Sequence, residues 1–152
     1  MTPPERPRHS VSVAAVITDE GGRVLVVQRR DNGKWEIPGG ILELGESIHA
    51  GMRREVEEET GVIAEPERLT GVYKNLRLGV VALVFRARIL SGQPRPTEES
   101  AAVDWWSADD VAERMGETFA IRVLDALDTT DVAVRLHDGV HLLAEEVTPP
   151  TR

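Results

Sequence analysis

Apolar residues in the first forty positions fall in short, valine-rich runs separated by turn-forming residues. Val11 to Ile17 and Val24 to Val27 are two such runs, with Asp-Glu-Gly-Gly between them. Branched side chains favour extended backbone, and neighbouring Asp and Gly residues favour tight turns. The pattern predicts two strands joined by a turn. A short third strand is expected in Trp-Glu-Ile-Pro-Gly-Gly, where the proline ends it.

The spacing of apolar residues changes from Ser47 onward. Ile48, Met52 and Val56 recur every four positions, which places them on one face of a helix. We therefore predict a helix over Ser47 to Thr60, with these three side chains forming its buried stripe. Gly61 is expected to end it, because glycine readily adopts the left-handed conformation at a helix C-terminus.

The rest of the chain alternates between β-rich and helical segments. Ser107 is a suitable N-cap for a helix, and Asp138 with Gly139 is a hairpin turn sequence. The predicted segments are β-rich residues 72–89, a polar loop at 90–100, a strand at 102–106, helices at 107–115 and 118–128, and a hairpin at 132–143.

These elements predict one domain of α/β or α+β class, with a mixed β-sheet sandwiched between helices. The 152 residues show neither an internal repeat nor a linker. Prolines near both ends predict a disordered arm at 1–10. We expect the domain at 11–127, and a C-terminal hairpin extension and tail at 128–152. The start lacks the apolar segment of a secretory signal, and no apolar run is long enough to span a membrane.

Composition narrows the function classes. The chain carries 26 acidic and 18 basic residues, a net charge of −8, which disfavours a nucleic-acid polymer as partner. The absence of cysteine excludes disulfides and thiolate zinc sites. These features fit a cytoplasmic protein with no membrane partner. A small anionic substrate stays possible if a cation bridges it to the protein.

The predicted helix carries an acidic run. Glu55, Glu58 and Glu59 stand at i, i+3 and i+4, so their carboxylates converge on one patch, whereas Glu57 points elsewhere. A solvated helix face, with Arg54 paired to Glu58, is the simpler interpretation. However, three carboxylates on one patch repel one another unless a hard divalent cation binds them, and oxygen ligands suit Mg²⁺ or Mn²⁺.

The residues before the helix have a fixed relation to this patch. Gly39 and Gly40 are expected to let the backbone turn sharply and present a carbonyl to it. Gly40, five residues, Glu46, seven residues, and then Arg54 to Val62 resemble the Nudix box at every specified position. The chain is thus identified as a MutT-like member of the Nudix hydrolase family, and the resemblance extends over most of Val11 to Arg114.

Nudix hydrolases cleave a diphosphate linked to another group by attack of water, with bound divalent metal. The resemblance implies Mg²⁺ as cofactor, with Mn²⁺ as a substitute. It places metal ligation on Glu58 and Glu59, and it makes Glu55 a ligand or a general base. The Gly39 carbonyl and Glu99, on a later loop, complete the expected ligand set.

The same resemblance assigns supporting roles. Arg54 would orient the glutamates, and Glu46 would brace the loop against the helix. The general base stays open between Glu55 and Glu99, with Glu98 as the alternative to Glu99. The expected catalytic residues are Arg54, Glu55, Glu58 and Glu99.

Three residues outside the box are candidates for substrate binding. Arg29 and Arg30 end the second predicted strand and could reach phosphates, or they could be solvated. Trp35 could stack on a base, or it could belong to the core.

His137 and His141 flank a hairpin turn expected to be exposed. A zinc site there is the weaker interpretation.

The preferred substrate is a nucleoside triphosphate, unmodified, oxidised or deoxy, released as monophosphate and pyrophosphate. ADP-ribose, another nucleotide sugar or a dinucleotide is the alternative. Leu78 stands where ADP-ribose-selective members often carry proline, and Gly79 or Val80 where dinucleoside polyphosphate hydrolases tend to carry tyrosine. A non-catalytic nucleotide sensor is disfavoured because the box is intact. A homodimer is compatible with the sequence.

Overall fold

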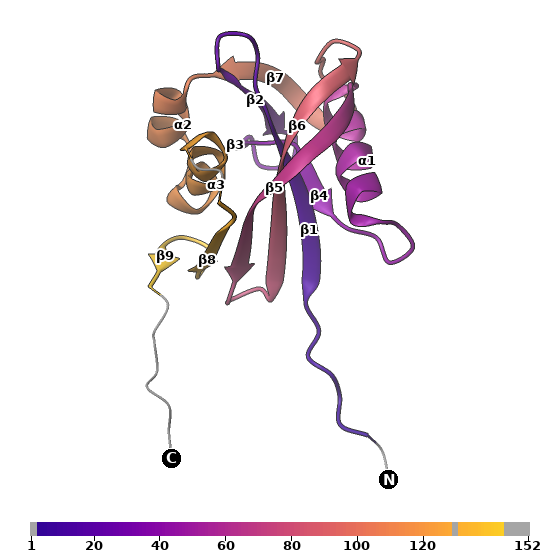
Figure 1. Cartoon of the computed structure of the whole chain (residues 1–152), viewed down its shortest axis with the longest axis vertical. Helices are drawn as coiled ribbons and strands as arrows, with labels where there is room; N and C mark the ends of the chain where they lie inside the picture. The colour runs from indigo at the N-terminus through magenta and orange to yellow at the C-terminus, as the bar shows by residue number, and fades with distance from the viewer. Residues whose placement is uncertain (1–2, 129–130, 145–152) are drawn as a thin grey trace.

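The computed structural model describes residues 3–128 and 131–144. The predicted tail from 145 lies outside the described residues, and residues 3–9 have no regular structure. In chain order the elements are β1 (Ser10–Ile17), β2 (Val24–Arg29), β3 (Trp35–Glu36), β4 (Gly39–Ile41), α1 (Ile48–Thr60), β5 (Ile63–Asn75), β6 (Val80–Ser91), β7 (Ser100–Trp106), α2 (Ala108–Arg114), α3 (Glu117–Asp128), β8 (Ala133–His137) and β9 (Leu142–Leu143) (Figure 1).

The strands form two sheets. The larger has the order β4-β1-β6-β5-β8-β9, with β1 parallel to β6, β5 parallel to β8 and the other pairs antiparallel. The smaller has the order β3-β2-β7 and is antiparallel. Helix α1 lies on one side of the strands, and α2 and α3 lie on the other (Figure 1). This mixed sheet between helices confirms the predicted fold class.

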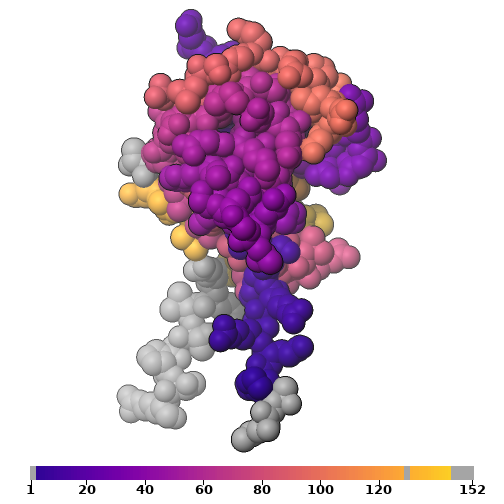
Figure 2. Space-filling model, turned by 90° about the vertical axis from the view of Figure 1, so that its right-hand side faces the viewer, coloured from indigo at the N-terminus to yellow at the C-terminus, as the bar shows by residue number. Residues whose placement is uncertain are grey.

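Strand β1 contributes to two hydrophobic clusters, because its side chains alternate between two covered faces. Val13, Ala15 and Ile17 pack in one cluster with Met52 and Val56 of α1. On the other face of β1, Ala14 and Val16 pack in the second cluster, whose members include Tyr73, Trp106 and Val123. Burial on both faces explains the unbroken apolar run of the first strand. Figure 2 views the molecule from the side that α1 covers.

Two predicted details of the elements are wrong. Ile48 is 43% exposed, because it is the first helical residue, so the buried stripe of α1 holds Met52 and Val56 but not Ile48. The β-rich segment begins at Ile63 rather than Val72 and makes two paired strands, β5 and β6. Pro66 and the register shifts near it hid the alternation from sequence analysis.

The C-terminal segment forms the predicted hairpin, since β8 and β9 pair across Asp138 and Gly139. Strand β8 also runs parallel to β5, so the hairpin continues the large sheet. His137 pairs with Asn75 and is only 2% exposed, so the expectation of an exposed histidine is wrong there. His141 is exposed beside Glu117. No helix among the described residues has both the length and the apolar character to cross a membrane.

Candidate metal and active site

Helix α1 brings two of the predicted carboxylates into the interior. Its first turn is capped by the Ser47 side chain, which accepts from the Ala50 N–H, and Gly61 ends it with φ of 77°. Glu55 and Glu59 lie one turn apart, and each is 8% exposed. Glu99 approaches from the loop before β7. Carboxylate oxygens of these three residues lie within 4.8 Å of one another, which makes them a candidate metal site.

Strand β4 covers this cluster, and its glycines allow the close approach. A Cβ on Gly40 would lie 2.5 Å from the Glu55 carboxylate, and a Cβ on Gly39 would collide with the Val13 carbonyl. Both glycines lie in a strand paired with β1, and neither has positive φ. The expectation of a sharp glycine turn is therefore wrong. The Gly39 N–H donates to Glu59 Oε2 at 2.7 Å, and its carbonyl as a metal ligand stays a prediction.

Arg54 joins the loop before α1 to the cluster. Its Nε and Nη2 donate to the two Glu46 carboxylate oxygens at 2.9 and 2.6 Å. Its Nη1 donates to Glu55 Oε1 at 2.9 Å and to Glu58 Oε2 at 3.2 Å. The hydrogen bonds from Arg54 lower the pKa of Glu46 to about 2. A planar guanidinium can hold several carboxylates at once, so Arg54 and Glu46 lie where they fix the orientation of Glu55.

Burial and charge crowding explain why the cluster suits a cation. Burial, together with the neighbouring Glu55, Glu36 and Glu99, raises the pKa of Glu59 to about 8, although the hydrogen bond from the Gly39 N–H opposes the rise. Burial also raises the pKa of Glu55, and Arg54 opposes that rise. Carboxylates that are held together although burial and repulsion disfavour their charge fit a hard divalent ion with oxygen ligands.

Glu58 does not join this group. Its side chain is 41% exposed, and its carboxylate accepts from Arg54. Glu59 lies in the cluster because β4 packs over that side of the helix, whereas Glu58 faces outward beside the exposed Glu57. The ligand and catalytic roles of Glu58 stay predictions, and so do those of the other site residues.

Arg30 and the loop before β7 together position Glu99. Arg30 Nη2 donates to the Thr97 carbonyl at 2.7 Å. The Thr97 hydroxyl accepts from the Glu99 N–H at 3.1 Å. The Ser100 hydroxyl donates to the Glu59 carbonyl and ties the loop to the end of α1. Arg30 thus contacts the loop that carries Glu99.

A cleft borders the cluster. A cavity of about 260 Å³ is lined by the backbone of Gly39 and Gly40, with Arg29 and Glu36 at its wall. Arg29 donates to Asp31 at 2.8 and 2.6 Å and to Glu36 at 3.2 Å, so it reaches the cleft as part of an ion-pair network. The carboxylate cluster therefore adjoins this cavity through Gly39 and Gly40.

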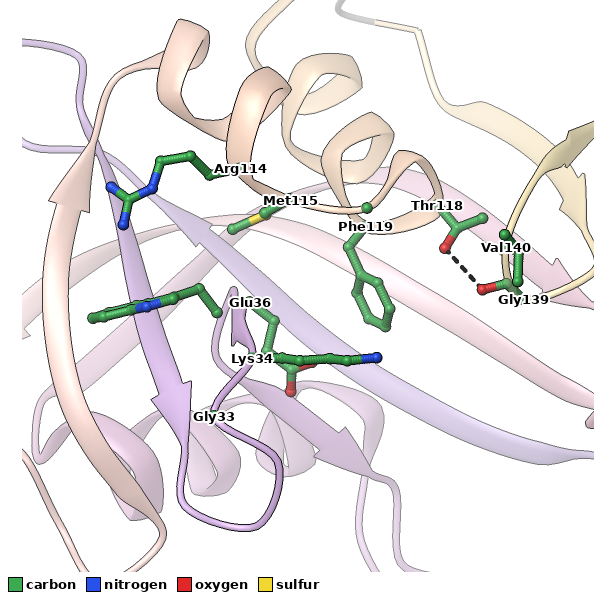
Figure 3. Close-up of a pocket in the computed structure, with 11 residues that line it drawn as sticks. Gly33, Lys34, Glu36, Arg114, Met115, Thr118, Phe119, Gly139 and Val140 are labelled. Atoms are coloured by element: carbon green, nitrogen blue, oxygen red, sulfur yellow. Dashed lines mark hydrogen bonds between the residues drawn. The ribbon is translucent and has the colours of Figure 1, made fainter.

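A larger cavity of about 490 Å³ adjoins the first and shares Glu36 and Phe119 with it. It lies between the β2–β3 loop and the α2–α3 junction, and the Phe119 ring projects into it (Figure 3). Trp35 lines this cavity and also packs on Trp106, with ring centroids 5.2 Å apart. Base stacking by Trp35 stays a prediction.

Sequence reasoning missed three residues that border the site. Glu36 contributes to the high pKa of Glu59, and its position in the segment Trp-Glu-Ile-Pro-Gly-Gly was a signal. Phe119 and Arg122 line the cleft from α3. They lie far from the box in sequence and carried no local signal.

A helix with buried carboxylates, covered by a glycine strand that also lines a cavity, can hold a divalent cation beside a bound substrate. The sequence model of the NUDIX domain matches residues 8–127. A "MutT-like protein" from Streptomyces ambofaciens is 56% identical over 137 residues, covering 90% of this chain and 89% of the relative. The chain belongs to the Nudix family, as the box indicated, and is a hydrolase that acts on pyrophosphate bonds.

The names of more distant relatives specify different substrates. An "ADP-ribose pyrophosphatase" from Methanocaldococcus jannaschii is 27% identical, over 67% of this chain and 64% of its own length. A "Putative 8-oxo-dGTP diphosphatase" from Bacillus subtilis is 32% identical, over 60% and 62%. The crystal structure of a NUDIX hydrolase from Nitrosomonas europaea has a TM-score of 0.74 at 21% identity, covering 88% of this chain and 82% of that one. It shows the shared fold.

Proposed function

We propose that the protein hydrolyses a nucleoside triphosphate, unmodified, oxidised or deoxy, to the monophosphate and pyrophosphate. The observation that carries this choice is the position of Leu78, which lines the cavity beside Gly39 and Gly40 and is 69% exposed. The position at which ADP-ribose-selective members often carry proline thus faces the cleft, and here it holds leucine. ADP-ribose, another nucleotide sugar or a dinucleotide is the second candidate.

We propose Mg²⁺ as the bound metal, with Mn²⁺ able to replace it. The support is the ligand chemistry, because Glu55, Glu59 and Glu99 offer only carboxylate oxygens. When bound, such a cation neutralises the diphosphate and lowers the pKa of a coordinated water. The cytoplasm as the site of action stays a prediction.

Other groups of the protein orient the carboxylates and supply the general base. Arg54 holds Glu55, and the Gly39 N–H holds Glu59, so both carboxylates are oriented before substrate arrives. Glu55 Oε1 already accepts from Arg54, which favours a ligand role for it. We propose Glu99 as the general base, because its loop is tied down by Arg30 while its carboxylate faces the other two.

The test is a hydrolysis panel with Mg²⁺ and with Mn²⁺, and with products identified by mass. It covers unmodified and oxidised nucleoside triphosphates, ADP-ribose, NADH, dinucleoside polyphosphates and nucleotide sugars. We expect pyrophosphate release from triphosphates that is lost in EDTA and falls at least 100-fold in Glu59→Gln. Glu57→Gln is the matched control, because Glu57 is an exposed glutamate of the same helix.

Two results would overturn the proposal. Turnover of ADP-ribose without turnover of triphosphates would move the assignment to the second candidate. Nucleotide binding without any hydrolysis would indicate a sensor.

Glu58→Gln is included in the panel, because a loss of activity as large as that of Glu59→Gln would support the ligand role expected for Glu58. Glu99→Gln should remove the acidic limb of the pH–rate profile, because a general base is inactive when protonated, whereas Glu55→Gln should leave that limb in place.

A further inference from the structure

Phe119, in the first turn of α3, lines three neighbouring cavities. One is the cavity of about 260 Å³ beside Gly39 and Gly40, and another is the cavity of about 490 Å³ next to Trp35. The third, of about 250 Å³, lies between α3 and the β8–β9 turn. The Phe119 ring projects into this space opposite Val140 (Figure 3). The hollow beside the carboxylate cluster therefore continues into two branches that meet at Phe119.

The two branches, of about 490 and 250 Å³, share a wall. The residues that line both of them are Thr118, Phe119, Gly139 and Val140. Phe119 is 38% exposed and Val140 is 59% exposed, so both side chains reach into the open space instead of the core. Residues that line two adjoining cavities lie between them. Phe119 and Val140 thus form a partition between the larger and the smaller branch.

Hydrogen bonds hold the Val140 side of this partition in place. The Val140 N–H donates to the Asp138 carboxylate at 2.9 Å. The Glu117 carboxylate accepts from the Leu142 N–H at 3.0 Å and joins the hairpin to the start of α3. Strand β8 also pairs with β5, so the turn is anchored to the large sheet as well. The hairpin lies outside residues 8–127, so half of the partition comes from beyond the part of the chain that matches the family.

The branches differ in what they can hold. Pockets for small organic ligands usually have volumes of roughly 300 to 1,000 Å³. The branch of about 490 Å³ falls within that range, and its aromatic rings, Trp35 and Phe119, suit a nucleoside. The branch of about 250 Å³ falls below it. A molecule whose diphosphate lies at the carboxylate cluster can place one nucleoside in the larger branch, but a second nucleoside would have to pass Phe119 and Val140.

We propose that the partition of Phe119 and Val140 determines specificity, because it admits substrates with one nucleoside and excludes dinucleotides. A binding site can discriminate by a steric barrier against the wrong ligand as well as by contacts with the right one. A nucleoside triphosphate needs only the larger branch, since its other phosphates are small hydrated anions. A dinucleotide carries a bulky nucleoside in their place. The inference rests on the proposed function, because it takes the nucleotide and the position of its diphosphate from there.

The test measures the dissociation constants of two analogues by calorimetry in the presence of Mg²⁺. They are ADP and NAD⁺ in which a methylene group replaces the oxygen between the phosphorus atoms, so neither is hydrolysed there. Only the NAD⁺ analogue carries a second nucleoside. We expect the unmodified protein to bind the ADP analogue about tenfold or more tightly. Val140→Ala and Phe119→Ala should each reduce this ratio about threefold or more, because they open the partition.

Val134→Ala is the matched control. Val134 is a 66% exposed valine of the same hairpin, and it lines none of the three cavities. Its ratio should equal that of the unmodified protein. The two analogues also differ in charge, so the decisive quantity is the change in the ratio between variants.

Several outcomes would overturn the inference. Equal binding of the two analogues by the unmodified protein does so without any variant. A ratio in Val140→Ala that matches the ratio in Val134→Ala would mean that Val140 excludes nothing. An equal loss of affinity for both analogues in Phe119→Ala would reduce the role of the ring to stacking on the base. If Phe119→Ala does not fold, Phe119→Leu keeps an apolar side chain without the ring, and an unchanged ratio there refutes the partition.

The reaction and the partition can fail separately. A ratio that depends on Val140 and Phe119, in a protein that hydrolyses no triphosphate, would sustain the inference and remove the proposed reaction. Triphosphate hydrolysis with a ratio that neither substitution changes would sustain the reaction and remove the inference.

Discussion

The high pKa of Glu59 predicts that the metal-free protein loses stability as pH rises. Its pKa is raised from 4.5 to about 8 in the folded protein. Between these values the carboxyl is protonated when folded and ionised when unfolded, so folding takes up a proton. Stability is then fully present below pH 4.5 and falls as pH rises through about 8. Glu59→Gln removes the titrating group and keeps an acceptor for the Gly39 N–H.

The size of the effect follows from the pKa difference. One pKa unit corresponds to about 1.4 kcal/mol, so the free energy of unfolding should fall by about 3 to 4 kcal/mol between pH 5 and pH 8. For a protein of this size that is a decrease of about 10 °C in Tm. In Glu59→Gln the decrease should shrink by at least half. Glu55, whose pKa is also raised, accounts for the remainder.

The assay is urea unfolding in EDTA at several pH values from 5 to 9, for the unmodified protein and Glu59→Gln. Addition of Mg²⁺ at pH 8 should restore the stability of the unmodified protein, by about 2.7 kcal/mol at a concentration 100 times its Kd. Glu59→Gln should respond less, because one ligand is neutral. Glu57→Gln should follow the unmodified protein throughout.

Parallel pH profiles of the unmodified protein and Glu59→Gln in EDTA would refute this reasoning. They would mean that Glu59 ionises at its ordinary pKa despite its burial. A rise in the stability of the unmodified protein from pH 5 to pH 8 would contradict it as well. Such a rise is expected of a carboxyl group whose pKa is lowered on folding, not raised.

Three further substitutions test the site and its support. Gly40→Ala should weaken Mg²⁺ binding at least tenfold, measured by calorimetry, because the new methyl group would displace the buried Glu55 carboxylate from its hydrogen bond with Arg54. Arg54→Lys should lower kcat/KM about 10- to 100-fold, since a single ammonium cannot hold both oxygens of Glu46. Tyr73→Phe should lower the free energy of unfolding by about 1 to 2 kcal/mol, because its buried hydroxyl donates to a carboxylate of α3 at 2.8 Å.

Matched controls separate these effects from general damage. Gly45→Ala should be neutral, since a Cβ there meets nothing within 4 Å. Arg53→Lys should keep full activity, because Arg53 pairs with the partly exposed Glu65 at the other side of the helix. Equal metal binding in Gly40→Ala and Gly45→Ala would contradict the packing argument, and equal kcat/KM in Arg54→Lys and Arg53→Lys would contradict the role of the fork.

Local chemistry explains which elements the sequence predicted. The runs at Val11 and Val24 are valine-rich over a strand length, and the segment before Gly61 repeats its apolar residues at helical spacing, so short-range physics decides both. The start of β5 was missed because Pro66 and the register shifts near it break the alternation that identifies a strand.

The box residues lie close together along the chain, and that is why sequence alone identified the family and the acidic face of α1. Which carboxylates form the cluster was decided by packing. Strand β4 covers Glu55 and Glu59 and leaves Glu58 outside, and the loop before β7 brings in Glu99. Gly39 and Gly40 were predicted to form a sharp turn. In the structure they lie in strand β4, where the absence of a Cβ lets the strand approach Val13 and Glu55 closely.

The sequence by itself determined the reaction class, because helical spacing and the glycine–glutamate pattern are local properties of one segment. Tertiary structure alone decided the burial of His137 and its place beside Arg122, since β8 pairs with a strand about sixty residues earlier. Burial and electrostatic environment depend on such distant pairings. They set the pKa of Glu59 and shape the cavities beside the carboxylate cluster, and no spacing along the chain encodes them.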